Sequence, residues 1–103
     1  MTTPALALAT QLRAELARRN IPSLLHELPD GWVALSLWRG LVARTDGHII
    51  WWTTPYMSRR NHPLATYAFH PQHAALRLSR HYPKARELHP VPLGRFAEIS
   101  API

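Results

Sequence analysis

Basic side chains gather in the second half of this 103-residue sequence and are the first feature that could do chemistry. Residues 56–95 carry seven of the twelve lysines and arginines but only one of the six acidic residues. Such an imbalance favours an anionic partner, because clustered charge of one sign attracts the other. We therefore expect contact with nucleic acid or with an acidic protein surface. The alternative is a solvated basic surface that binds nothing in particular.

Two segments bring most of these cations together. The stretch TTPYMSRRNHP is typical of a loop, with prolines at its ends and two arginines inside it. The stretch HPQHAALRLSRHYPKAR predicts a helix over residues 71–82, since Pro71 suits the first helical position and Pro83 ends it. Its basic stripe lies opposite the predicted buried stripe and could follow a phosphate backbone. The candidate nucleic-acid-binding residues are Arg59, Arg60, His73, Arg77, Arg80 and Lys84.

Tryptophans are the second feature, because two of them stand side by side in GHIIWWTTP. Consecutive strand residues point to opposite faces of a sheet, so only one of the two can face a given core. Asp46-Gly47 is a strong two-residue hairpin signal, and Arg39-Gly40 is a weaker one. These turns predict three short antiparallel strands, at about 33–38, 41–45 and 48–53.

Counting outward from two-residue turns divides the strand residues between two faces. The more continuously apolar set is the predicted core face: Val33, Leu35, Leu37, Val42, Ile49, Trp51 and Thr53. The other set forms an aromatic face, on which Trp38 and Trp52 flank Leu41. The C-terminal segment covers this face, or a second subunit does, or it is an exposed stacking platform. A one-residue bulge would exchange the two faces after it.

The remaining segments complete an α+β fold. Thr3 and Pro4 suit the start of a first helix that ends at about residue 19, with an apolar stripe from Ala5 to Leu16. Residues 64–69 alternate as a fourth strand. The predicted fold is an antiparallel three- to four-stranded meander packed by an N-terminal and a C-terminal helix, in the order α-β-β-β-β-α. Residues 1–83 form this single domain, and residues 84–103 form an extended Pro-rich tail that packs on the domain or on a partner subunit.

Other functional classes find little support in the sequence. Without cysteine there is no disulfide, no thiolate zinc site and no cysteine nucleophile. No Gly-rich phosphate loop, G-x-S-x-G or H-E-x-x-H is present, so we expect no enzyme, with an unrecognised histidine-based activity as the open alternative. We expect no cofactor and no metal, although His70 and His73 stand three apart. The start lacks the pattern of a signal peptide, and no stretch of about 18 apolar residues could cross a bilayer. We therefore expect a cytoplasmic protein without a membrane partner.

Two resemblances bear on function. The order of helix, three strands and helix is similar to the double-stranded-RNA-binding domain, whose loops and C-terminal basic helix contact two minor grooves and the phosphates between them. This sequence has HPQHAAL where that family has a lysine-rich helix start, and it adds a fourth strand. The chain also resembles small uncharacterised actinobacterial proteins, and this resemblance implies a regulatory or accessory role. The shared residues are Gly40-Leu41-Val42, Asp46-Gly47 and Trp51-Trp52.

Together these patterns predict a small non-enzymatic binding or regulatory protein. It contacts nucleic acid through the basic C-terminal helix and the preceding loop, and alanine at Arg77 and Arg80 weakens that contact without lowering the melting temperature. The alternative is a protein-interaction module or homodimeric accessory protein that uses the face of Trp38 and Trp52.

Overall fold

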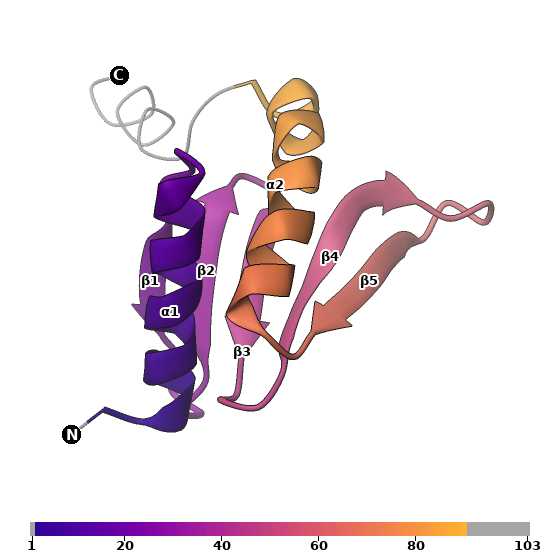
Figure 1. Cartoon of the computed structure of the whole chain (residues 1–103). Coiled ribbons are helices and arrows are strands. Elements are labelled where there is room, and N and C mark those ends of the chain that lie inside the picture. The colour runs from indigo at the N-terminus through magenta and orange to yellow at the C-terminus, as the bar shows by residue number, and fades with distance from the viewer. Residues whose placement is uncertain (1, 91–103) are drawn as a thin grey trace, which may run out of the picture.

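One antiparallel sheet with two helices on the same face makes up the domain (Figure 1). The computed structural model describes residues 2–90, so the predicted tail beyond residue 90 lies outside the described residues. The strands pair in chain order, β1-β2-β3-β4-β5, and the sheet is a meander. The predicted α+β class is confirmed, with β1 as a fifth strand. The elements are α1 Pro4–Arg18, β1 Leu24–Glu27, β2 Val33–Trp38, β3 Leu41–Thr45, β4 Ile50–Met57, β5 Pro63–Ala68 and α2 Pro71–Leu88.

Helix α1 begins and ends where the sequence predicts. The Thr3 hydroxyl accepts a hydrogen bond from the Leu6 amide at 3.1 Å, and proline follows at the first helical position. At the other end Asn20 adopts a positive φ of 59°, which turns the chain out of the helix. The buried stripe, which packs on the sheet, consists of Ala5, Ala9, Leu12 and Leu16.

A bulge in β2 decides which strand residues face the helices. Trp38 pairs with Leu41, as a two-residue turn requires, but the next pair is Ser36 with Val42, so Leu37 is the extra residue. Because side chains alternate along a strand, one extra residue moves the residues before it to the opposite face. Leu35 consequently pairs with Ala43, whereas a strand without the bulge would pair it with Arg44.

The connection after β3 is longer than predicted. Thr45 pairs with Ile50, so residues 46–49 all belong to the turn. The Asp46 carboxylate accepts hydrogen bonds from the backbone amides of His48 at 2.8 Å and Ile49 at 3.1 Å, and these bonds lower the pKa of Asp46. Gly47 has a φ of 104°, and a Cβ there would lie 2.7 Å from the Pro4 Cβ. Adding two residues leaves the alternation of β3 and β4 unchanged.

The predicted core face is therefore wrong for β3 and β4. Trp52 is 1% exposed and lies in one apolar cluster with the helices, whereas Trp51 points to the opposite side. The strand residues of this cluster are Val33, Leu35, Leu37, Trp38, Leu41, Ala43, Ile50, Trp52 and Ala68. The face predicted to need a cover is covered by α1 and α2 themselves (Figure 1).

Helix α2 continues through Pro83 to Leu88, beyond its predicted end at residue 82. Proline removes one intrahelical hydrogen bond, a cost that packing of the last turns offsets here. Ala85 is buried, and the Tyr82 ring meets the Trp38 ring edge-on at 5.8 Å. The predicted boundary at residue 83 is therefore displaced, and residues 84–88 belong to the domain.

Candidate nucleic-acid interface

The sheet face opposite the helices carries a row of aromatic side chains. Trp32 lies just before β2 and meets Trp51 of β4 edge-on, with ring centroids 4.8 Å apart. Trp51 is the cross-strand partner of Tyr67 in β5, and the Tyr67 and Phe69 rings lie 5.5 Å apart. We call these four residues the aromatic row. Trp32, Tyr67 and Phe69 are 39%, 56% and 60% exposed, so most of the row is open to solvent.

An arginine lies beside the aromatic row, and no acidic strand residue lies on the same face. Arg44 is exposed and stands between Ala34 and Trp51 in the cross-strand pairing. The five strands contain one acidic residue, Glu27, which pairs with Val33 and so belongs to the helix-covered face. None of the three ion pairs found within residues 2–90 involves Arg44. This open face therefore combines exposed rings with an arginine that takes part in no ion pair found within residues 2–90.

The predicted aromatic face is part of the interior. The Trp52 indole N–H donates to His81 Nδ1 at 3.0 Å, and the Trp38 indole N–H donates to the His89 carbonyl. Leu41 is completely buried in the same apolar cluster. Both indole N–H groups have partners on or just after α2, so Trp38 and Trp52 hold this helix against the sheet. Their rings offer no surface for stacking.

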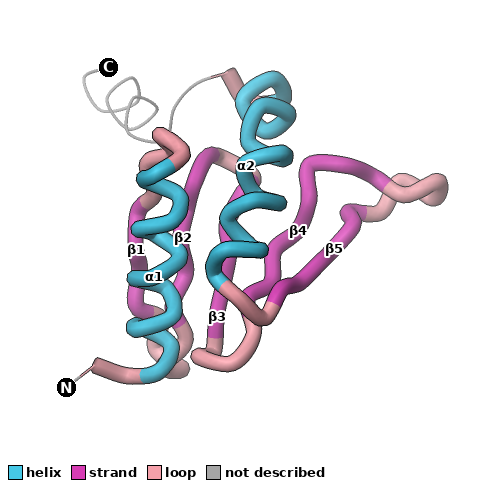
Figure 2. Tube along the Cα trace, in the orientation of Figure 1, coloured by secondary structure: helices cyan, strands magenta, loops and turns pink. Residues whose placement is uncertain are grey.

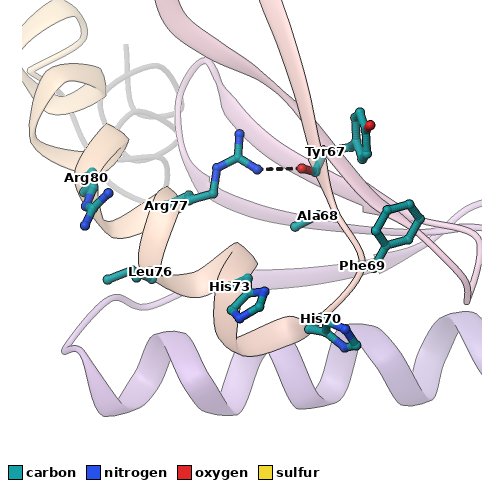
Figure 3. A pocket seen from close by; sticks show the side chains of 8 residues that line it. All are labelled: Tyr67, Ala68, Phe69, His70, His73, Leu76, Arg77 and Arg80. Carbon is teal, nitrogen blue, oxygen red and sulfur yellow. Dashed lines mark hydrogen bonds between the residues drawn. The ribbon is translucent and has the colours of Figure 1, made fainter.

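Arg77 is a structural residue rather than a free phosphate contact. Its guanidinium donates to the Tyr67 carbonyl at 2.6 Å and to the Thr66 hydroxyl, and lies 5.1 Å from the centre of the Trp52 ring. Figure 3 shows this side chain reaching from α2 to β5. The prediction that Arg77 lines an exposed basic stripe is therefore wrong, because a helical stripe cannot reveal partners supplied by a neighbouring strand.

Replacing Arg77 by alanine is expected to lower the free energy of unfolding by about 1–3 kcal/mol, since two acceptors lose a charged donor. Replacing Arg80, which is exposed, should change it by less than about 0.5 kcal/mol. Urea denaturation of both variants measures the difference. Equal stability of the two would show that the bonds to β5 contribute nothing.

The other predicted cations do not form one stripe. Lys84 is paired with Glu87 at 3.5 Å, whereas His73 and Arg80 are exposed. Arg59 and Arg60 occupy the turn of the β4–β5 hairpin, which projects beyond the helices (Figure 2). The candidate residues are therefore divided between the hairpin tip and α2.

A cavity of about 390 Å³ lies between the end of β5 and α2 (Figure 3). The strand end supplies Tyr67 and Phe69, so the cavity adjoins the aromatic row. The helix supplies an apolar residue and several basic ones, and none of the lining residues is acidic. These helical residues are His73, Leu76, Arg77 and Arg80.

His81 gives the core a pH-sensitive contact. Burial and then the nearby positive charge of Arg77 lower the pKa of His81 below its ordinary value of 6.5. The neutral ring is also required by structure, because its Nδ1 accepts the Trp52 indole N–H. Protonation removes that acceptor.

Stability is therefore expected to fall as the pH is lowered through and below about 6.5, where the unfolded chain takes up a proton that the folded chain resists. A group with a depressed folded-state pKa contributes stability that is fully present above its unfolded pKa. His81→Gln keeps an acceptor for Trp52 without titrating, so its unfolding free energy should fall less between pH 7 and 5. Parallel slopes for the two proteins would contradict this role.

Within residues 2–90 no three histidine, aspartate or glutamate side chains come together as metal ligands. Over the same part of the chain, no helix is both long and apolar enough to span a bilayer. Comparisons with models of protein families, with curated proteins and with solved structures yield no match. Functional inference therefore starts from the open face itself.

Proposed function

We propose that this protein binds single-stranded nucleic acid on the open face of its sheet. The observation that carries this proposal is the aromatic row, which exposes three large rings on a face that neither helix covers. Exposed aromatic patches mark contact sites, because water solvates them poorly. Unpaired bases supply flat partners, and stacking on an aromatic side chain contributes about 1–3 kcal/mol per base.

The charge of the protein supports an anionic strand over a neutral partner. The formal net charge is +6, and Arg44 stands within the row itself. Arg59 and Arg60 at the tip of the β4–β5 hairpin add exposed positive charge at the end of the sheet. Phosphates neutralise such charges with release of counterions, which makes the affinity depend on salt.

Single strands fit this site better than a duplex. Bases inside a duplex are stacked on one another and cannot lie flat on a sheet, whereas single strands can splay their bases onto aromatic side chains. The duplex contact expected from a basic α2 loses support, because Arg77 and Lys84 have partners within the protein. The basic residues then serve mainly to attract the strand.

A protein partner is the second candidate, and one feature favours it. Leu24 of β1 is 51% exposed and lies on the same face as the row, which widens the apolar surface. A second copy of the chain could bury this surface against itself. Sedimentation at several concentrations distinguishes this case, since a stable dimer that does not bind nucleic acid would favour it.

Fluorescence anisotropy of labelled oligonucleotides tests the proposal directly. We would compare DNA and RNA single strands of about 12 nucleotides with duplexes of the same sequence, at about 50 and 200 mM salt. The single strands should bind more tightly than the duplexes at both concentrations, and more weakly at the higher one. No binding at the lower concentration, or tighter binding of duplexes, would contradict single-strand recognition.

A further inference from the structure

The cavity between β5 and α2 lies around the edge of the sheet from the aromatic row. Tyr67 and Phe69 line the cavity and β5 is the last strand of the sheet, so a strand that leaves the row around this edge meets the cavity. Phe69 and Leu76 are 60% and 42% exposed and provide two apolar surfaces. Figure 3 shows the strand end and the helix on opposite sides of this site.

The size of the cavity limits its occupant. Pockets for small ligands range from about 300 to 1,000 Å³, and this one has a volume of about 390 Å³. That space accommodates one nucleotide rather than several. The pocket therefore differs from the open row, which offers a flat surface.

The charges of the cavity favour a phosphate over a neutral group. His70, His73 and Arg80 line it together with the engaged Arg77, and none of its lining residues is acidic. Within residues 2–90, none of the three ion pairs involves Arg80. A phosphomonoester carries a charge of about −1.5 to −2 at pH 7, more than the single charge of a phosphodiester linkage. Two arginines around one small cavity suit the larger charge, and the histidines add ring N–H donors.

We propose that this cavity binds a nucleoside monophosphate group, with its phosphate at Arg80 and His73. The group is either the phosphorylated terminal nucleotide of a strand on the aromatic row or a free nucleotide. The first case rests on the proposed function of the row, because the row then delivers the strand end. The second case does not.

Binding of end-phosphorylated strands distinguishes these cases. The probes are a 5′-phosphorylated strand labelled at its 3′ end, a 3′-phosphorylated strand labelled at its 5′ end, and the hydroxyl counterpart of each. One phosphorylated strand should bind roughly tenfold more tightly than its counterpart, as expected for charge-assisted hydrogen bonds. A free nucleoside monophosphate is titrated in parallel by calorimetry.

Arg80→Gln provides the decisive variant, and Arg13→Gln provides its control. Both arginines are exposed and both changes remove one charge, but Arg13 lies on α1 outside the cavity. Arg80→Gln should abolish most of the preference for the phosphorylated end, whereas Arg13→Gln should retain it. If the free monophosphate binds and Arg80→Gln weakens that binding, the pocket is likewise supported. Its ligand is then a free nucleotide.

Two results separate failure of the pocket from failure of the row. If phosphorylated and hydroxyl strands bind equally and the free monophosphate does not bind, the pocket proposal is overturned while strand binding stands. If no strand binds, the proposed function is overturned, and the calorimetric titration alone then decides the pocket. An effect of Arg13→Gln equal to that of Arg80→Gln would reduce the preference to general electrostatics and overturn the pocket.

Discussion

Trp52→Ala is expected to lower the free energy of unfolding by about 3–5 kcal/mol, the range for deletion of a large aromatic side chain from a core. Trp52 is 1% exposed, and its indole N–H is bonded to His81. The substitution leaves a cavity between the sheet and α2 and removes that hydrogen bond. Because small domains are stable by only about 5–15 kcal/mol, the variant should lie close to unfolding. Urea denaturation followed by circular dichroism measures the loss.

Trp51→Ala is the matched control, since it removes the same side chain from the adjacent position on the other face. Trp51 is half-buried and meets the Trp32 ring, so its loss should cost less than half as much. Should the Trp52 variant fail to fold, Trp52→Phe and Trp51→Phe provide a milder pair with the same expected order. A larger loss of unfolding free energy for the Trp51 variant would show that Trp51, and not Trp52, is the core residue.

Replacing both Tyr67 and Phe69 by alanine is expected to weaken single-strand binding at least about tenfold, because each stacked base contributes about 1–3 kcal/mol. Both rings are more than half exposed, so stability should change little. Anisotropy titrations give the affinity, and urea denaturation shows whether the domain is intact.

Tyr56→Ala controls for the loss of an exposed aromatic ring elsewhere. Tyr56 is 44% exposed but packs near His81 of α2, which places it on the helix side of the sheet. Its replacement should leave the affinity for single strands within about twofold of the original, as expected for a site outside the contact. Equal losses in this variant and in the Tyr67/Phe69 pair would mean that the row is not the binding surface.

Local signals in the sequence predict most of the elements. Thr3-Pro4 marks the start of α1, Pro71 marks the start of α2, and Asp46-Gly47 marks a turn between strands, as the structure confirms. These signals succeed because capping, fixed φ and positive φ act within a few residues. The end of α2 is different, since packing of Ala85 and Tyr82 against the sheet carries the helix past Pro83.

The faces of the sheet depend on one residue that leaves no mark in the sequence. Ser36, Leu37 and Trp38 all suit a regular strand, and nothing in their types reveals that Leu37 is a bulge. A single unpaired residue exchanges the two faces of the sheet beyond it. Because the prediction assumed a regular strand, it assigned Trp51 to the core in place of Trp52. The sets of residues that share a face in β3 and β4 were nevertheless predicted correctly, because the longer turn preserves their alternation.

The sequence also does not show that the residues of the proposed site lie together in the fold. Tyr67 and Phe69 alternate within the predicted fourth strand, but only its pairing with β4 places Tyr67 beside Trp51. Trp32 precedes its strand and joins the row through a diagonal contact. Arg77 is bonded partly to a backbone carbonyl, for which no side-chain type gives a signal.

The indole N–H signals of the four tryptophans in a ¹H–¹⁵N spectrum test single-strand binding on the open face most directly. The signals of Trp38 and Trp52 belong to bonded, buried groups, and those of Trp32 and Trp51 belong to the aromatic row. On addition of an unlabelled single strand, we expect the Trp32 and Trp51 signals to shift while the Trp38 and Trp52 signals stay in place. Unchanged signals for Trp32 and Trp51, or shifts confined to Trp38 and Trp52, would contradict binding on this face.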